Sequence, residues 1–357
     1  MKLSALSKTL SATIITISTT AAFAQPVSSL DGFFSEQGEQ VTPASYPTNE
    51  TSHQMLKNQD LVGVNTFLHK RQLTPTDNQP VVRMNRDTYY SMAVVDVSKG
   101  ASIIIPKMPE GKYVSVQPVT EDHRIQPMYY GAGTYELSTH SGDHLYLVVR
   151  LDATLSEEQA AKIQDQMQLK ANSAKAFSAE PVNQQSFKKV EDELKAQMLA
   201  ISERDGKNAL TGMFTAPNDD SNKLYTQEKY QVGAAVGWGG AQQADNIYEL
   251  SGNYPADTCH QATFKDPKNH AFWSITVYNK AGFMFNDSAN LSSNNAKPNS
   301  DGTYTISFGC GEDAINNIKT ANDTGVFNLG VRHYQPSDMI KVDGYRIVPR
   351  VKSDNEV

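Results

Sequence analysis

The segment Asn85–Ser91 concentrates an amide, a guanidinium, a carboxylate, hydroxyls and two aromatic rings in seven residues. Such a set could bind a polar ligand, with Arg86 forming a bidentate contact to a carboxylate or phosphate. Asn85, Asp87 and Tyr89 would supply further contacts to that ligand. The same residues also suit a turn, because Asn and Asp side chains bond to neighbouring backbone groups. The sequence leaves both roles open.

A second polar set lies near the C-terminus, where Arg332 and Tyr334 alternate with apolar residues. Side chains two positions apart on a strand share a face, so this pair could line a ligand groove or a contact between domains. His333 falls on the opposite, apolar face of the same strand. We therefore interpret it as a buried, hydrogen-bonded histidine and not as a catalytic base.

Asp122 and His123 stand in a loop, where a carboxylate beside a histidine could act as acid and base or bind a metal. Adjacent side chains on an extended chain point apart, which weakens the pair as a site. With Asp87, these two residues are the candidates for catalysis. Trp238 lies in a glycine-rich stretch, where it could stack on a ligand or simply mark a linker.

Known catalytic and cofactor motifs do not occur in the sequence. There is no His-x-His, His-Glu-x-x-His or Cys-x-x-Cys metal pattern, no Gly-x-Ser-x-Gly elbow and no nucleotide-binding glycine motif. The sequence therefore indicates no metal site and no cofactor. A metal bound by residues from distant segments would leave no such motif.

The first 24 residues resemble a secretory signal, with two lysines, an uncharged stretch and Ala-Phe-Ala before Gln25. We expect cleavage after Ala24 and a periplasmic or secreted protein. The chain then keeps Cys259 and Cys310 as its two cysteines. An oxidising compartment permits a disulfide between them, and two buried free thiols are the alternative.

Composition excludes several classes of partner. The 357 residues are 39% hydrophobic and carry a net charge of −7. Removing residues 1–24 takes two of the 32 basic residues and none of the 39 acidic ones, so the charge becomes −9. Without a basic surface or a long apolar run, we expect no nucleic-acid partner and no transmembrane segment. A homo-oligomer stays open.

The hydrophobic pattern predicts two β-rich halves joined by helices. We expect a signal peptide at 1–24, an irregular leader at 25–50 and a β-rich N-terminal α+β domain at 51–155 that opens with a helix over 51–70. A helical connector at 156–244 should begin with a Ser156–Gln159 capping box, and residues 233–240 carry too many glycines for a helix. Strands should follow at 270–278, 303–308, 325–334 and 345–351. Residues 245–357 should form a jelly-roll-like antiparallel sandwich.

Two motif sets carry a family resemblance. Residues 85–91 and the strand Gly111–Gln117 resemble domain-of-unknown-function family 1254. The strand Phe272–Tyr278, the turn at 301–303 and residues 332–336 and 345–349 resemble family 1214. Residues 321–325 depart from the stretch usual in that second family. The resemblance implies a two-domain, mostly β protein and no established activity.

Three hypotheses for function remain. The leading one is an exported protein that binds a small polar or carbohydrate-like ligand. The second is an uncharacterised hydrolase or isomerase with its site between the domains, for which Arg86, Asp87, Asp122, His123 and Arg332 are the candidate residues. The third is a self-assembling envelope protein, since tyrosine-rich sandwich faces also form oligomer interfaces.

Overall fold

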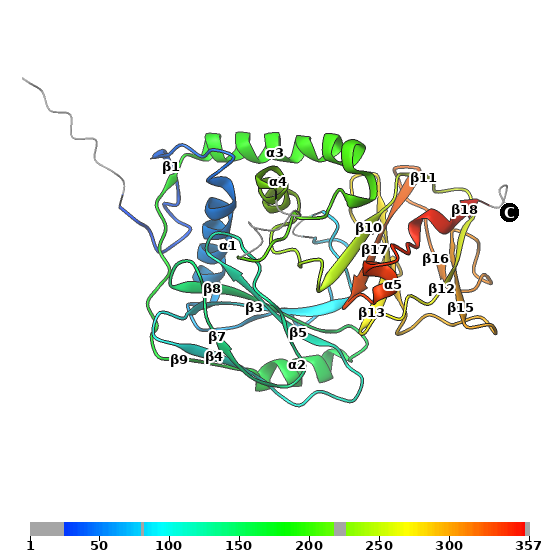
Figure 1. Cartoon of the computed structure of the whole chain (residues 1–357), viewed down its shortest axis with the longest axis horizontal. Helices are drawn as coiled ribbons and strands as arrows, with labels where there is room; N and C mark the ends of the chain where they lie inside the picture. Colours follow the sequence, from blue (N-terminus) through cyan, green and yellow to red (C-terminus); the bar gives the residue numbers. More distant parts are fainter. Residues whose placement is uncertain (1–24, 80–81, 218–225, 354–357) are drawn as a thin grey trace, which may run out of the picture.

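The computed structural model describes residues 25–79, 82–217 and 226–353. The expected signal segment lies outside these ranges. Two mainly antiparallel β assemblies lie side by side, and helices cover the first of them (Figure 1). The chain is therefore mainly β with some α.

The N-terminal domain contains two sheets that pack face to face. The larger sheet has, in spatial order, β2 (Leu68–His69), β3 (Thr88–Asp96), β8 (His144–Asp152), β5 (Val114–Thr120) and β6 (Tyr129–Tyr130). The smaller has β7 (Gly133–Leu137), β4 (Ala101–Ile105) and β9 (Gln168–Ala171). Residues at alternate positions of β3, β5 and β8 fill the core between the two sheets.

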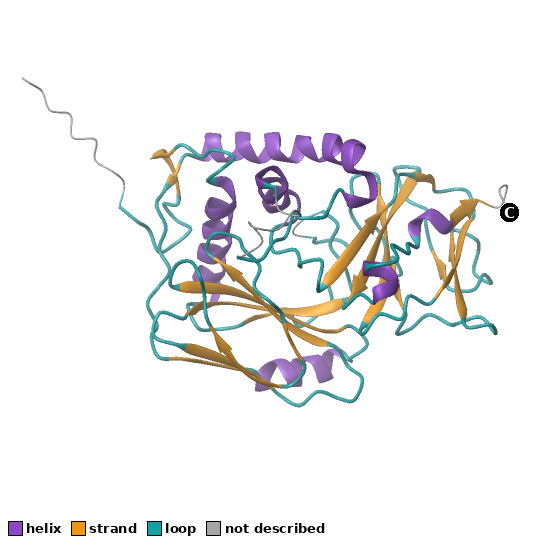
Figure 2. Cartoon of the chain, in the orientation of Figure 1, coloured by secondary structure: helices purple, strands orange, loops and turns teal. Residues whose placement is uncertain are grey.

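Helices cover the other face of the larger sheet, as Figure 2 shows in purple. They are α1 (Tyr46–Val62), α3 (Gln184–Asp205) and α4 (Gln227–Gly237), whereas α2 (Glu157–Gln166) packs into the core between the two sheets and bonds β3 through Gln164. The predicted Ser156–Gln159 capping box is present at the start of α2. The segment 156–244, expected as a connector, thus contributes its helices to the N-terminal core.

Two predictions about helices are wrong. The first helix begins at Tyr46, so residues 25–50 are not all irregular. It ends at Val62, before a positive-φ Gly63, and Leu68–His69 form a strand. Residues 25–50 also contain β1 (Phe34–Glu39). The glycine-rich segment after 233 begins inside α4. A Cβ on Gly233 would lie 2.5 Å from the Met213 carbonyl oxygen, so close packing requires glycine there.

The C-terminal domain is a sandwich of two sheets. One contains β10 (Asn246–Leu250), β17 (Val326–Tyr334), β13 (Phe272–Asn279) and β14 (Asn290–Ser292), with β11 (Tyr254–Pro255) also paired to β17. The other contains β16 (Asn317–Ile318), β15 (Thr303–Phe308), β12 (His260–Lys265) and β18 (Val351–Ser353). Trp273, Ile275 and Val277 face the core between them, as their alternation predicts.

The end of the chain differs from expectation. Residues 345–351 do not form one strand, because a short helix (η3, Val348–Arg350) precedes β18. Two further short helices are η1 (Gly206–Asn208) and α5 (Asp338–Lys341). Cys259 and Cys310 form a disulfide that ties the start of β12 to the end of β15. Within the described ranges, no helix has the length and apolar character needed to cross a membrane.

Candidate functional site

The turn before β3 places one carboxylate between the two domains. The Asn85 side-chain oxygen accepts a hydrogen bond from the Asp87 amide (3.0 Å), and the Asn85 amide donates to the Tyr90 hydroxyl (3.1 Å). These bonds fold the chain so that Asp87 leaves the N-terminal sheet and points toward β13 and β17. The segment therefore forms a turn and also directs a polar side chain toward the C-terminal domain.

Asp87 is 3% exposed and is bonded by the C-terminal domain. Ser274 and Tyr334 donate hydroxyl hydrogen bonds to one carboxylate oxygen (2.7 and 2.8 Å). Asn290 donates its amide to the other oxygen (2.6 Å). Three donors on one buried carboxylate make a fully bonded contact between the domains, which we call the Asp87 latch.

Arg332 extends this latch. Its guanidinium donates to the Thr276 hydroxyl (3.2 Å), the Tyr278 hydroxyl (2.9 Å) and the Arg83 carbonyl (2.7 Å). It also lies 4.0 Å from the Asp87 carboxylate. Burial opposes the charge on Arg332, but Tyr278 and Asp87 outweigh it and raise its pKa. Arg332 is therefore a permanently charged part of the seam with three hydrogen-bond acceptors.

A polar cavity of about 170 Å³ opens beside the latch. Both domains line it, with three carboxylates, one guanidinium and three amides among its side chains. The lining residues are Leu73, Arg86, Asp87, Asp152, Ala153, Thr154, Asp287, Asn290, Ser292, Asn294 and Asn295. Formal charges there sum to a negative value, so the cavity favours neutral or cationic groups over anions.

Arg86, the candidate for binding an anion, is already occupied. Its guanidinium donates to the Thr74 carbonyl (2.8 Å) and lies 3.2 Å from the carboxylate of Asp287. Asp287 has 80% of its side chain exposed, so this ion pair stands at the mouth of the cavity. Arg86 thus lines the cavity while its charge is balanced within the protein.

The remaining candidates lie apart from this site. Tyr89 points into the core between the N-terminal sheets and donates its hydroxyl to the Leu155 carbonyl (3.0 Å). Trp238 follows α4, where its indole donates to Thr51 (2.9 Å) and stacks on His123. Neither residue lines the cavity.

Asp122 and His123 do not meet Asp87 through any contact in the described part of the chain. Asp122 pairs with His140 (3.1 Å). His123 is 1% exposed, has a φ of 61°, and accepts the Gly239 amide at its Nε2 (3.0 Å). Burial lowers the pKa of His123 to about 3 against the opposing effect of Asp122, so the ring is neutral near pH 7.

His333 is fully buried and bonded at both ring nitrogens. One nitrogen lies 2.7 Å from Glu249, and the other lies 3.1 Å from the amide of Asn269. Glu249 in turn accepts backbone amides of Ile347 and Val348. This is the satisfied core histidine that the alternation of β17 predicts.

Sequence reasoning missed a second arginine at the same seam. Arg150 lies near the end of β8, beside Tyr90 on β3 and Ser115 on β5. Its only signal in the sequence is a charge within the otherwise apolar run Leu145–Leu151. Ser274 and Asn290, which bond Asp87, carried no signal, because their role depends on a partner about 190 residues or more away.

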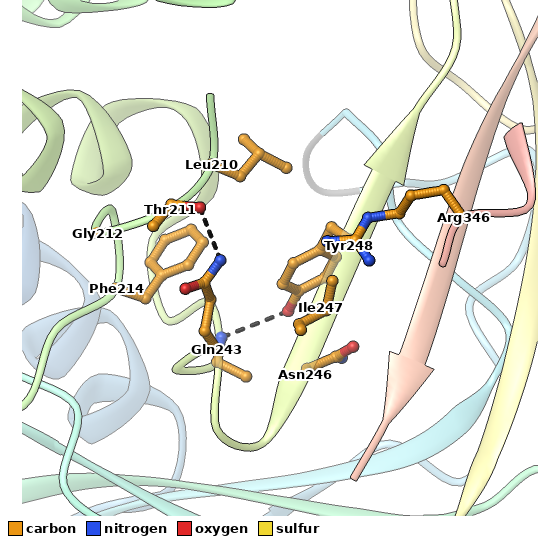
Figure 3. A pocket seen from close by; sticks show the side chains of 10 residues that line it. Leu210, Thr211, Gly212, Phe214, Gln243, Asn246, Ile247, Tyr248 and Arg346 are labelled. Carbon is orange, nitrogen blue, oxygen red and sulfur yellow. Dashed lines mark hydrogen bonds between the residues drawn. The ribbon is translucent and has the colours of Figure 1, made fainter. Parts of the chain in front are cut away.

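A smaller pocket, about 20 Å³, lies between the helical layer and β10 (Figure 3). Phe214 and Gln243 form one side, and Tyr248 and Arg346 form the other. The Gln243 amide donates to Thr211 (2.7 Å). This volume holds about one water molecule, so we do not assign a ligand to it. Elsewhere in the described ranges, no group of three or more His, Cys, Asp or Glu side chains could hold a metal.

Comparison with known proteins agrees with this architecture. Residues 64–174 match the family described as "Protein of unknown function (DUF1254)", and residues 246–338 match "Protein of unknown function (DUF1214)". A search of curated proteins gave no match. The VPA0106 protein from Vibrio parahaemolyticus is similar in structure, with a TM-score of 0.62 and 15% identity over 87% of this chain and 97% of that one.

An uncharacterized protein from Burkholderia cenocepacia is also similar, with a TM-score of 0.51 and 14% identity. That alignment covers 87% of this chain and 86% of the other. At such identities the likeness concerns the fold alone. The chain is therefore a two-domain protein that joins a DUF1254 region to a DUF1214 region.

Proposed function

We propose that the protein binds a small, neutral, polyhydroxylated ligand, such as a monosaccharide, in the cavity beside the Asp87 latch. The observation that carries the proposal is the cavity's lining, in which carboxylates and amides of both domains converge. Carboxylates accept hydrogen bonds from ligand hydroxyls, and amides both donate and accept. The negative balance of charge argues against a phosphate or a carboxylate.

The size of the cavity supports a small ligand. A volume of about 170 Å³ has room for several water molecules, because about 10–15 Å³ is enough to hold one. Pockets for drug-sized ligands start near 300 Å³. A single sugar ring or a polyol is therefore a better match than an oligosaccharide.

Several lining groups keep capacity for a ligand. Asn290 uses its amide nitrogen on Asp87 and Thr276, which leaves its carbonyl oxygen to accept a hydroxyl. Asn295 accepts from Ser292 with its oxygen, which leaves its amide nitrogen to donate. Donors and acceptors thus stand on the same wall of the cavity.

A thermal-stability screen of neutral sugars and polyols, followed by calorimetry, tests this proposal. We expect at least one compound to raise the melting temperature. The variant Ala153→Phe, which fills the cavity, should abolish that rise. Asn78→Leu is the control, because Asn78 is exposed and does not line the cavity.

Loss of binding in both variants, or in neither, would contradict the assignment of the cavity. If Ala153→Phe folds poorly, Asn294→Trp closes the same cavity from its exposed rim. A screen without any stabilising sugar or polyol would overturn the proposal itself.

We also infer that the protein is exported and cleaved after Ala24. The pattern of residues 1–24 and the disulfide between Cys259 and Cys310 support this, since disulfides persist in oxidising compartments. Expression of the full chain in a bacterium, fractionation and intact mass measurement test it. A periplasmic or secreted product beginning at Gln25 is expected. A cytosolic product that retains residues 1–24 would refute export.

A further inference from the structure

Arg150 lies where the larger N-terminal sheet meets the C-terminal domain. On the sheet, Tyr90 flanks it with a cation–π contact (5.7 Å from guanidinium carbon to ring centre), and Gln117 accepts one N–H (2.7 Å). The hydroxyls of Tyr90, Tyr248, Tyr113 and Tyr334 favour its charge against the effect of burial, and its pKa is raised. Gln117 in turn donates to the Gly239 and Gly240 carbonyls, next to the Ala241 amide that bonds Tyr248, so this permanent cation lies near tyrosines of both domains.

The bonding capacity of this cation is largely unused. A guanidinium carries five N–H donors. Across the described ranges, Gln117 is the one hydrogen-bond acceptor for Arg150, and no carboxylate lies within 4.0 Å of its nitrogens. Arg332, which lies opposite Tyr248 on the neighbouring strand, donates to three acceptors and approaches Asp87. Buried or half-buried arginines are normally paired, so Arg150 stands out.

The nearby acidic group does not neutralise Arg150. Asp245 feels the charge of Arg150, but its carboxylate accepts a hydrogen bond from the Tyr130 hydroxyl (2.6 Å). Burial raises the pKa of Asp245. Its presence also limits the positive potential, which favours a ligand with a single negative charge over a dianion such as phosphate.

The cluster keeps some exposed surface and offers further donors. Arg150, Tyr90, Tyr113 and Tyr248 are each partly exposed although they lie between the domains. The Tyr248 oxygen accepts the Ala241 amide (3.4 Å), which leaves its hydroxyl proton to donate. A charged guanidinium and a tyrosine hydroxyl, with aromatic rings around them, suit a carboxylate on a small organic body.

We propose that Arg150 and Tyr248 form a second binding site, for the carboxylate group of a small organic acid. This site is separate from the acidic cavity. Arg150 does not line that cavity, and the two sites favour opposite ligand charges. The inference therefore does not depend on the proposed sugar binding.

Calorimetry and thermal shift with sodium benzoate test the site, with benzamide as the neutral compound of similar shape. We expect benzoate to bind and benzamide not to bind, with affinity falling as salt increases. Arg150→Gln should weaken benzoate binding at least about tenfold, because it removes a charge-assisted hydrogen bond. The control Arg71→Gln removes an exposed arginine that pairs with Asp165 and should change nothing.

Tyr248→Phe is a milder variant that keeps the ring, and it should weaken benzoate binding several-fold. It also keeps the test decisive if Arg150→Gln does not fold. Unchanged benzoate affinity in Tyr248→Phe and in a folded Arg150→Gln would overturn the proposal, as would equal binding of benzamide. Ala153→Phe separates the two sites, since it should lose sugar binding and retain benzoate binding.

Discussion

Polar groups of the two domains differ in how completely they are bonded. On β17, Arg332 donates to two hydroxyls and one carbonyl, and His333 is bonded at both ring nitrogens, to a glutamate and an amide. In the N-terminal domain, Arg150 has one acceptor, and the buried Nδ1 of His123 has no partner within the described residues. Complete networks hold a structure together, whereas incomplete ones leave capacity for a ligand or a proton.

Asp87→Ala is the variant most able to break this contrast. It removes the carboxylate near Arg332 and leaves Ser274, Tyr334 and Asn290 without their acceptor. A buried cation without its partner costs about 3–5 kcal/mol. Guanidinium denaturation should show a loss of that size.

The matched control is Asp287→Ala, whose exposed ion pair with Arg86 should contribute less than about 1 kcal/mol. A loss below about 1 kcal/mol for Asp87→Ala would mean that the latch does not stabilise the seam.

The pH dependence of stability tests the role of His123 in the N-terminal region. The pKa of His123 is about 3 in the folded state and about 6.5 when unfolded, so the unfolded state binds more protons between these values. Stability should therefore fall as the pH drops below 6.5, by about 2 kcal/mol at pH 5. His123→Asn, which tolerates a positive φ, should remove the contribution of His123, whereas the similar contribution of His69 remains.

His69→Asn is the comparison variant. Burial also lowers the pKa of His69, to about 4, so protonation of His69 also lowers stability as the pH falls. Urea denaturation from pH 7 to 5 measures both. An unchanged slope in His123→Asn would show that His123 does not take up the proton.

Tyr334→Phe sharpens the contrast with a smaller change. It removes one donor to Asp87 but keeps the ring stacked 4.2 Å from Phe272. We expect a loss of about 1–2 kcal/mol by chemical denaturation. Tyr304→Phe, a half-buried tyrosine outside the seam, should cost no more than about 0.5 kcal/mol. Equal losses in the two variants would contradict the role of the Tyr334 hydroxyl.

Arg150→Met should have the smallest effect on stability. Replacing an incompletely bonded arginine with an apolar side chain of similar length is often neutral or stabilising. We expect the free energy of unfolding to change by less than about 1 kcal/mol in either direction. A loss above about 3 kcal/mol would place Arg150 among the structural residues, together with Arg332.

The sequence predicted the elements whose side chains follow a simple period. The alternation of β13 and β17 assigned Trp273 and His333 to the apolar face and Arg332 to the polar face, and the structure agrees. The course of α4 was not predictable, because Gly233 is required by the Met213 backbone, which comes from another segment. The prediction of one strand over residues 345–351 was wrong because a three-residue helix is too short to show a helical period in the sequence.

The site was only partly predictable for a related reason. Asn85, Arg86 and Asp87 were singled out for their polar chemistry, but only the fold joins Asp87 to Tyr334 across 247 positions. Asp122 and His123 were also candidates for catalysis, and their neighbours in space place them elsewhere. Arg150 was overlooked because its lack of a carboxylate partner is a property of the surrounding structure.

The disulfide has a consequence for how the protein would survive proteolysis. Cys259 and Cys310 enclose β12 to β15, and with them the exposed Asn294 and Asn295 at the rim of the cavity. A protease that cut this loop once would leave both fragments covalently joined. Such a nicked molecule would migrate as one species without reducing agent and as two with it, while β13 stayed paired to β17.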